Sequence, residues 1–506
     1  MSALREIATA FISVWYKDSL EKIIQALDKL DIQIYSTGGT ADFIEKMNVS
    51  VTRVENITGY PSIFGGRVKT LHPKIFGGIL ARRNEKKDAE ELAKYEIPPF
   101  DLVVVDLYPF GETVASGASR EEIIEKIDIG GISLIRAAAK NFSDVLIIPS
   151  RNHYSDLIDI LIHQNGETDL QAREKFAIEA YRVSSEYDTA IHNYFTQTSE
   201  KDSFSVSFQN GRQLRYGENP HQKALYYGSF PFNQLHGKEI SYNNLLDIDA
   251  ALGLISEFTE TTFAILKHNN ACGLASRDTL KQAWLDALAG DPISAFGGVL
   301  ITNREVNSET ADEINKLFFE VIIAPGYNEE ALSILKQKKN RIILANKDSD
   351  LPDKLVRTVP GGILVQERDS KTESEADLKA VTKVSPTKDE IKDLIFANKV
   401  VKHSKSNAII LAKNRQLLGS GVGQTSRIDA LRQAIDKAVA ARFELSEAVM
   451  ASDAFFPFAD SVEIAHKAGI TAVIQPGGSV RDNDSIDFCN INKMKMVFTG
   501  VRHFKH

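Results

Sequence analysis

Short apolar runs alternate with helical patterns along the first part of the chain. The apolar runs are TAFISVW (9–15), IQIYSTGG (32–39), DLVVVDLYPF (101–110) and VLIIPS (145–150). Buried strands that alternate with helices indicate a mainly parallel sheet with helices on both faces. A long helix then closes this unit, because apolar residues at spacings of three and four mark one helical face: Phe176, Ala180, Val183, Tyr187, Ile191 and Tyr194.

A polar, Ser/Thr-rich stretch, FTQTSEKDSFS (195–205), separates this region from the next. It contains few apolar residues and lies between two strongly patterned regions, which is typical of a linker. We therefore predict a first domain over residues 1–198 and a second over residues 199–506.

The second region repeats one order of strands and helices twice. Its apolar runs are TFAILKH (262–268), ISAFGGVLIT (293–302) and VIIAPG (321–326), then NAIILAKN (407–414), AVMASDAFFPFAD (448–460) and TAVIQPGG (471–478). The order suggests a duplicated α/β/α layer, with halves at about 199–370 and 371–506. Between the halves, QERDSKTESEADLKAV (366–381) predicts a charged, exposed connection.

Composition narrows the class of protein without identifying a function. The chain has 506 residues, 43% hydrophobic and 25% charged, with a formal charge of −8. The acidic balance argues against a nucleic-acid-binding protein, and no apolar run approaches the ~18 residues that a membrane span needs. The start, MSALREIATAF, lacks a signal-peptide pattern, so we expect a cytoplasmic protein that acts on neither nucleic acid nor membranes.

Metal and disulfide chemistry are not indicated. The only cysteines are Cys272 and Cys489, too few for a disulfide framework or a cysteine-rich zinc site. The eleven histidines form no His-Glu-x-x-His motif, and no Pro-Cys-x-x-Cys motif of zinc deaminases occurs. We expect no catalytic metal.

Three glycine pairs stand where a strand meets a helix: STGGTAD (36–42), FGGRVKT (64–70) and IDIGGIS (127–133). Such turns expose backbone N–H groups beside the positive end of a helix dipole, so they can hold a phosphate. One pair alone is more often a plain turn. Three pairs in one domain, one of them carrying Arg67, Lys69 and Thr70, favour a phosphorylated ligand.

Isolated polar residues follow apolar runs in both regions. Asp106, Tyr108, Asp128 and Lys140 stand at strand exits or helix ends of the first region. Open α/β sheets place ligand crevices there, but helix capping and a basic last helical turn explain the same positions equally well. Both interpretations stay open.

The second region contains two further candidate segments, and its last ten residues can be interpreted in two ways. The buried run in FAILKHNNACG (263–273) ends abruptly in polar residues, which indicates either a solvated turn or a site. The loop RQLRYGENPHQ (212–222) concentrates donors around a Gly and a Pro. The stretch VFTGVRHFKH (497–506) either frays or is tied down by a strand over KMVFTGV (495–501).

Seven motifs in this order resemble one known family. They are GGRVKTLHP, IDIGGISLIRAAAKN, RYGENPHQ, LKHNNACG, SKSNAI, SDAFFPF and RHFKH. The family joins phosphoribosylaminoimidazolecarboxamide (AICAR) formyltransferase to inosine monophosphate (IMP) cyclohydrolase. The resemblance implies an α/β protein with an N-terminal methylglyoxal-synthase-like parallel-sheet domain, followed by two cytidine-deaminase-like α/β/α subdomains without zinc. It also implies a homodimer with shared formyltransferase sites.

The resemblance implies that a formyl group moves from 10-formyltetrahydrofolate, a co-substrate, to the 5-amino group of AICAR, giving formyl-AICAR (FAICAR). No tightly bound cofactor is expected. The matching catalytic residues are Lys267, His268, Asn407 and His506. The matching substrate-binding residues are Arg215, Tyr216, Asn244, Arg427, Phe455, Phe456, Arg502 and Phe504.

The second implied reaction closes FAICAR to IMP with loss of water. The matching catalytic residues are Lys69, Tyr108, Asp128 and Lys140. The residues expected to hold the nucleotide and its phosphate are Ser13, Lys17, Thr37, Gly38, Gly39, Thr40, Arg67, Thr70, Gly130 and Gly131.

Two departures from the family pattern fall in the cyclohydrolase part. Many members have Ser-Val-Ser-Asp-Lys where this chain has SVWYK (13–17), and Asn where it has Asp106. A carboxylate near a phosphate is unfavourable unless it points away or pairs with a lysine. Two alternatives to the bifunctional enzyme therefore remain: a formyltransferase with an impaired cyclohydrolase, and a non-catalytic purine-nucleotide-binding protein.

Overall fold

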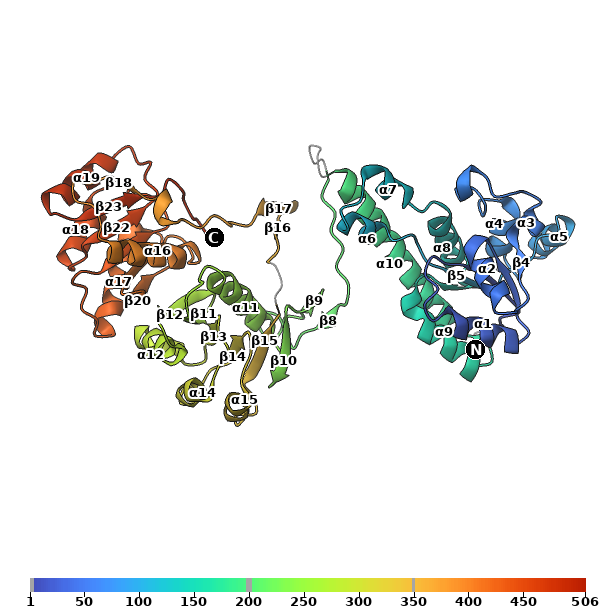
Figure 1. Cartoon of the computed structure of the whole chain (residues 1–506), viewed down its shortest axis with the longest axis horizontal. Helices are drawn as coiled ribbons and strands as arrows, with labels where there is room; N and C mark the ends of the chain where they lie inside the picture. The colour runs from blue at the N-terminus through green and yellow to red at the C-terminus, as the bar shows by residue number, and fades with distance from the viewer. Residues whose placement is uncertain (1–3, 197–202, 348–350) are drawn as a thin grey trace. The chain divides into compact units, whose positions relative to one another are not determined.

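The computed structural model describes residues 4–196, 203–347 and 351–506. The chain forms two compact units, residues 1–207 and 208–506 (Figure 1). The boundary predicted between residues 198 and 199 lies outside the described residues.

The first unit contains a five-stranded sheet in the order β4-β3-β2-β5-β6. Its strands are β2 (Thr9–Ser13), β3 (Gln33–Ser36), β4 (Thr52–Arg53), β5 (Leu102–Val105) and β6 (Leu146–Ile148), and β1 (Arg5–Glu6) pairs separately with β7 (Glu167–Thr168). Its helices are α1 (Leu20–Lys29), α2 (Gly38–Lys46), α3 (Val54–Thr58), α4 (Pro73–Leu80), α5 (Lys86–Lys94), α6 (Phe110–Ala115), α7 (Arg120–Glu125), α8 (Gly130–Lys140), α9 (Tyr154–His163) and α10 (Leu170–Phe195), with short 3₁₀ turns at Phe64–Gly66 and Arg151–His153.

All four pairings in this sheet are parallel, as predicted. Every residue of β5 and β6 is buried, because helices cover both faces of the sheet. Helix α1 packs against α9, whereas α8 packs against α4 and α10. The long closing helix predicted from the periodic apolar residues is α10 (Figure 1).

The second unit is built around a twelve-stranded sheet. The strands of the large sheet are β10 (Phe232–His236), β11 (Thr262–Lys267), β12 (Asn270–Ser276), β13 (Val299–Thr302), β14 (Val321–Ala324), β15 (Ile342–Asn346), β18 (Lys379–Ala380), β19 (Ile409–Lys413), β20 (Gln416–Gly421), β21 (Val449–Ser452), β22 (Ala472–Gln475) and β23 (Lys495–Phe498). Two separate pairs are formed by β8 (Arg212–Gln213) with β9 (Leu225–Tyr226) and by β16 (Lys354–Val359) with β17 (Gly362–Glu367). Its helices are α11 (Tyr242–Ile255), α12 (Leu280–Gly290), α13 (Pro292–Ala295), α14 (Ser308–Asn315), α15 (Glu329–Leu335), α16 (Lys388–Lys402), α17 (Arg427–Ala440), α18 (Asp460–Lys467) and α19 (Asp482–Ile491), with a 3₁₀ turn at Glu375–Asp377.

The strand order of this sheet is mirrored about its centre. It runs β10-β15-β14-β13-β11-β12 and then β20-β19-β21-β22-β23-β18, joined where β12 pairs with β20. Each half contains an antiparallel hairpin, β11–β12 or β19–β20, preceded by helix α11 or α16. The repeated order of elements therefore exists in the structure, including a hairpin in each half that the sequence patterns did not reveal.

Side chains that alternate along these strands separate two layers of core. Ala264 and Leu266 of β11 contact the core under α11 and α16, whereas Phe263 and Ile265 contact the core under α12, α14 and α15. Helices α17, α18 and α19 cover the corresponding face of the other half. Alternation with a period of two thus places helices on both faces of the sheet.

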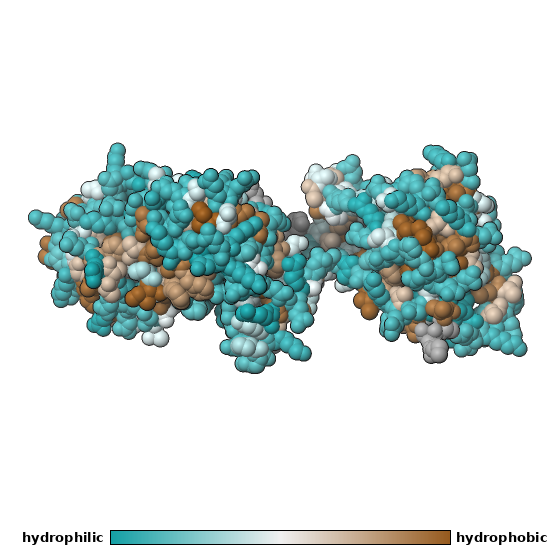
Figure 2. Space-filling model, turned by 90° about the horizontal axis from the view of Figure 1, so that it is seen from below, coloured by the Kyte–Doolittle hydropathy of each residue, from teal (hydrophilic) through white to brown (hydrophobic). Residues whose placement is uncertain are grey.

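The stretch 366–381 differs from its prediction as a simple exposed connection. Asp369 and Lys371 are exposed, but Glu373 is only 4% exposed because it is held by a buried histidine and an asparagine. On the face that Figure 2 shows, brown apolar areas lie within a mainly teal, hydrophilic surface. Within the described ranges no helix is long and apolar enough to cross a membrane.

Candidate functional site

A cavity of about 770 Å³ opens at the carboxyl ends of β2, β3 and β5 in the first unit. Parallel sheets place ligand crevices at this edge, and the volume suits a small-molecule ligand. The cavity brings together twelve of the predicted residues: Ser13, Lys17, Thr37, Gly39, Thr40, Arg67, Lys69, Thr70, Tyr108, Asp128, Gly130 and Gly131.

One corner of the cavity is suited to an anion. Thr37 precedes the first turn of α2, and its buried Oγ1 has no hydrogen-bond partner within the described part of the chain. Gly38 has φ +52°, and a Cβ there would lie 3.4 Å from Lys69 Nζ. The helix N-terminus, an unpartnered hydroxyl and an ammonium therefore meet at one place, the arrangement that binds phosphate.

The start of α8 forms a second side of the cavity. Asp128 Oδ1 accepts a hydrogen bond from Gly131 N at 2.6 Å. A Cβ on Gly131 would lie 2.6 Å from Asp128 Oδ2, and one on Gly130 would lie 2.9 Å from Thr70 Oγ1. A side chain at either glycine would therefore force Asp128 or Thr70 to shift. Burial raises the pKa of Asp128, although the Gly131 N–H partly offsets this effect.

Asp106, the residue that departs from the family pattern, points toward the backbone of the other departing segment. Its carboxylate accepts hydrogen bonds from Trp15 N and, at 3.1 Å, from Tyr16 N. Burial raises the pKa of Asp106 to about 6, while these N–H groups and Lys17 oppose the rise. The backbone of residues 15 and 16 therefore holds the Asp106 carboxylate at the edge of the cavity, with Lys17 nearby.

Trp15 and Tyr108 form an aromatic wall of the cavity, defined here by these two rings. Their centroids are 5.1 Å apart in an edge-on arrangement, and Lys126 Nζ lies 4.3 Å from the Trp15 ring centroid. The Tyr187 hydroxyl on α10 donates to Lys126 O at 2.7 Å and accepts from Asp128 N at 2.8 Å. Sequence patterns placed Tyr187 only on a helix face and gave Lys126 no role.

Lys140 is not part of this cavity, contrary to its grouping with Lys69, Tyr108 and Asp128. It is exposed at the last position of α8, whereas the cavity contacts the first turn of that helix. The rise of 1.5 Å per residue separates the two ends by about 15 Å. Arg67 does line the cavity, where it pairs with Glu125.

In the second unit the polar ending of FAILKHNNACG forms the tight turn of the β11–β12 hairpin. His268 and Asn269 have φ of 52° and 65°, as two-residue hairpin turns require. Asp247 on α11 accepts from Asn269 N at 2.7 Å, and Lys267 Nζ donates to Phe296 O at 2.9 Å. The turn is thus held by neighbouring elements.

The same turn occurs in the other half of the sheet. Asn414 and Arg415 have φ of 52° and 53°, and the carboxylate of Asp393 on α16 accepts from their backbone N–H groups at 2.7 and 2.6 Å. The two hairpins are therefore built alike, but only the first carries a histidine beside a lysine.

A buried polar cluster surrounds Asn407. Arg427 donates to Asn407 Oδ1 at 3.1 Å and pairs with Asp453, which is 1% exposed. The β11–β12 hairpin reaches this cluster through Asn270 Oδ1, which accepts from Lys405 N at 3.0 Å. The structure thus connects the segment that carries His268 to the segment that carries Asn407.

The remaining predicted residues of this unit occupy varied environments. Arg215 donates to the Tyr216 hydroxyl at 2.6 Å in the loop between β8 and β9. Asn244 completes the capping box at the start of α11, because its Oδ1 accepts from the N–H of the N-cap residue Ser241 at 3.2 Å. Phe455 is 38% exposed, but Phe456 is fully buried in the core, so only Phe455 can reach a ligand without repacking.

Among the residues that the structure describes, no group of three or more His, Cys, Asp or Glu side chains could hold a metal ion. Both cysteines are buried and unpaired, and burial raises the pKa of each thiol to about 12. Neither thiol is therefore activated as a nucleophile.

The sequence matches two known family models and several proteins of one name. The family described as AICARFT/IMPCHase bienzyme matches residues 138–437, and the MGS-like domain matches residues 19–133. The bifunctional purine biosynthesis protein PurH of Bacteroides thetaiotaomicron is 60% identical and covers 100% of both chains. The protein of the same name from Aquifex aeolicus is 47% identical over 98% of this chain and 100% of the relative. That from Caldicellulosiruptor saccharolyticus is 46% identical over 98% of this chain and 99% of the relative.

Proposed function

The chain belongs to the AICARFT/IMPCHase bienzyme family, and from this premise we propose which residues perform each reaction. The protein is a bifunctional enzyme of purine biosynthesis, a formyltransferase and a cyclohydrolase. Its first unit has the parallel sheet of an MGS-like domain. We propose that the cyclohydrolase lies in this unit and the formyltransferase in the second, whose two halves we assign to cytidine-deaminase-like folds without zinc.

Formyl transfer is assigned to the β11–β12 turn and the Asn407 cluster. The AICAR amine attacks the formyl carbon of 10-formyltetrahydrofolate and loses a proton, and the N10 atom leaves with a proton. His268 takes the amine proton, while Lys267 and Asn407 stabilise the oxyanion; such roles typically contribute ~10²–10⁴-fold and ~10²–10³-fold. The fixed turn, connected through Asn270 to the Asn407 segment, supports this assignment.

Ring closure is assigned to the cavity of the first unit. The carboxamide nitrogen attacks the formyl carbon, and the carbinol oxygen leaves as water. The reaction is intramolecular, so holding FAICAR in a folded conformation supplies much of the rate without a cofactor. Lys69 stabilises the developing oxyanion, and Asp128 and Tyr108 transfer protons. The raised pKa of Asp128 suits a group that both accepts and donates a proton.

We assign the nucleotide phosphate to Thr37 and Gly38 at the start of α2, and the base to the aromatic wall of Trp15 and Tyr108. The unpartnered Thr37 hydroxyl is the single observation that carries the phosphate assignment. The full-length identity to bifunctional purine biosynthesis proteins argues against the impaired-cyclohydrolase alternative.

The proposal extends to partners of the enzyme. We propose a homodimer whose formyltransferase sites combine residues of both subunits, with AICAR, FAICAR, IMP and folate as its ligands. Lys140 lies away from the cavity of its own chain, so it has no assigned step within one subunit.

Two variants test the division of labour. His268→Ala should lose formyl transfer by at least ~10²-fold while cyclising supplied FAICAR normally. Asp128→Asn should do the reverse. Chromatography that separates AICAR, FAICAR and IMP measures both steps. Loss of both activities in a folded variant would contradict separate sites.

A further inference from the structure

The segment 499–506 presents alternate side chains to opposite sides. Arg502, Phe504 and His506 are exposed, whereas His503 between them is only 2% exposed. The Arg502 guanidinium lies 4.4 Å from the Phe504 ring centroid, and the Phe504 and His506 centroids are 5.7 Å apart. We propose that these three residues, which match substrate-site residues of the family, contact AICAR; they form one row, and His503 points the other way.

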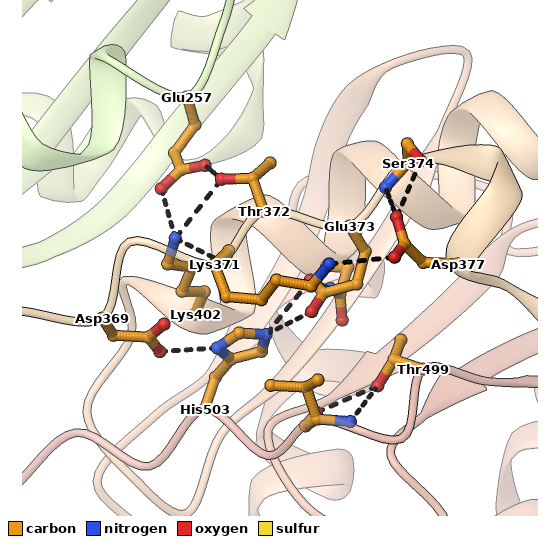
Figure 3. A network of polar contacts seen from close by, with 12 residues as sticks. Glu257, Asp369, Lys371, Thr372, Glu373, Ser374, Asp377, Lys402, Thr499 and His503 are labelled. Atoms are coloured by element: carbon orange, nitrogen blue, oxygen red, sulfur yellow. Dashed lines mark hydrogen bonds and ion pairs between the residues drawn. The ribbon is translucent and has the colours of Figure 1, made fainter.

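His503 is held by two carboxylates on the connection between the halves of the sheet. Its Nδ1 lies 2.6 Å from Asp369 Oδ2, and its Nε2 lies 3.1 Å from Glu373 Oε2 (Figure 3). Since both ring nitrogens face carboxylates, the ring donates from both, as an imidazolium does. Burial alone would lower the pKa of His503, but these hydrogen bonds outweigh it and raise the pKa to about 9.

The carboxylate partners are themselves fixed. Glu373 accepts a hydrogen bond from Asn398 Nδ2 on α16 at 2.8 Å. Lys402, also on α16, donates to Lys371 O at 2.8 Å and pairs with Glu257 at 2.7 Å (Figure 3). The other titratable groups of this network are His403, which contacts Glu257, and Asp377, which pairs with Lys371. His503 is thus anchored to a rigid network that joins both halves of the sheet.

Backbone hydrogen bonds hold the same segment on its other side. His503 N donates to Asp453 O at 3.0 Å, Ser406 N donates to Lys505 O at 2.9 Å, and Lys505 N donates to Ser406 Oγ at 3.1 Å. These bonds bring the segment beside the Asn407 cluster. Only the His503 side chain ties it to the 369–373 connection within the described bonds.

We propose that His503 is a positioning residue of the formyltransferase site: its side chain fixes the segment so that Arg502, Phe504 and His506 face the substrate. The inference rests on the proposed function of those three residues. His503 itself touches no substrate, because it is buried on the opposite side.

The test measures formyl transfer and FAICAR cyclisation in the full-length variants His503→Ala and His503→Gln. We expect the KM for AICAR to rise at least ~10-fold in His503→Ala, less in His503→Gln, and cyclisation to stay unchanged. His466→Gln, at an exposed histidine on α18, is the matched control and should resemble the wild type. An unchanged KM in both His503 variants would overturn the proposal.

The pH profile supplies a readout that a merely structural role would not change. Because the folded-state pKa of His503 lies above its ordinary value, the anchor is intact below about pH 9 and is lost as the pH rises through it. The KM for AICAR should therefore rise above about pH 9 in the wild type. This rise should be absent from His503→Gln, and its persistence there would overturn the proposal even if His503→Ala fails to fold.

A second pair of variants separates this inference from the proposed function. Arg502→Ala and Phe504→Ala should each raise the KM for AICAR. If they do so and the His503 variants do not, only the positioning role fails. If neither Arg502→Ala nor Phe504→Ala changes the KM, the assigned substrate face itself is wrong.

Discussion

Replacing Trp15 tests whether the aromatic wall binds the base of the nucleotide. Trp15 lines the cavity, is 44% exposed and contacts Tyr108 edge-on. Stacking of a base on an aromatic side chain contributes about 1–3 kcal/mol. Lys126 already covers part of the Trp15 ring, so we take the lower range, about 1–2 kcal/mol. Trp15→Ala should therefore weaken IMP binding by about 5- to 30-fold.

Trp15→Phe keeps an aromatic ring and should weaken binding by less than about 5-fold. Calorimetric titration with IMP measures both constants. Formyl transfer, assigned to the other unit, serves as the internal control and should not change. Equal IMP affinity in the wild type and Trp15→Ala would refute the assignment of the base to this wall.

Tryptophan emission gives an independent measurement on the same residue. The chain has two tryptophans, and the other, Trp284, is fully buried in the second unit. In Trp284→Phe, bound IMP should change the emission of Trp15 and protect it from acrylamide. Binding detected by calorimetry without a change in emission would contradict contact between the base and Trp15.

Three further predictions concern the first unit. Burial raises the pKa of Asp106 to about 6, so the folded state holds the proton of this carboxyl more tightly than the unfolded state does. The free energy of unfolding should therefore fall by about 1–3 kcal/mol between about pH 4 and about pH 6. Denaturant titrations should show that Asp106→Asn lacks this pH dependence. Tyr187→Phe removes the hydroxyl that donates to Lys126 O and accepts from Asp128 N. It should lower the free energy of unfolding by about 1–3 kcal/mol and slow cyclisation but not formyl transfer. An unchanged melting temperature would contradict this. Gly131→Ala places a Cβ 2.6 Å from Asp128 Oδ2 and should displace that carboxylate. The kcat for cyclisation should fall at least ~10-fold, while the melting temperature changes little. A normal kcat would show that Asp128 can shift freely.

The sequence predicted those features that follow from periodicity. Strands β2, β3, β5 and β6 and helix α10 were found from apolar runs and helical spacing, since burial imposes those patterns. The two-residue strands β1, β4 and β7 are too short to leave such a pattern. The glycine turns at 38–39 and 130–131 were found because such turns leave a local signature, and the cavity brings most of them together. In the second unit, the order of elements was apparent for the same reason.

Features that depend on distant contacts were not predicted. The His268–Asn269 turn is held by Asp247 from helix α11, and His-Asn after an apolar strand does not by itself distinguish a hairpin from a loop. The burial of Glu373 depends on a histidine that follows it by 130 residues. Lys140 was grouped with the cavity by motif alone, although the length of α8 separates them.

The central claim is that one chain performs two consecutive reactions at separate sites. A single-turnover experiment with AICAR and formyl-labelled 10-formyltetrahydrofolate tests it most directly. The label should appear first in FAICAR and then in IMP, and Asp128→Asn should stop the sequence at labelled FAICAR. Accumulation of FAICAR in the wild type without conversion to IMP would contradict the account.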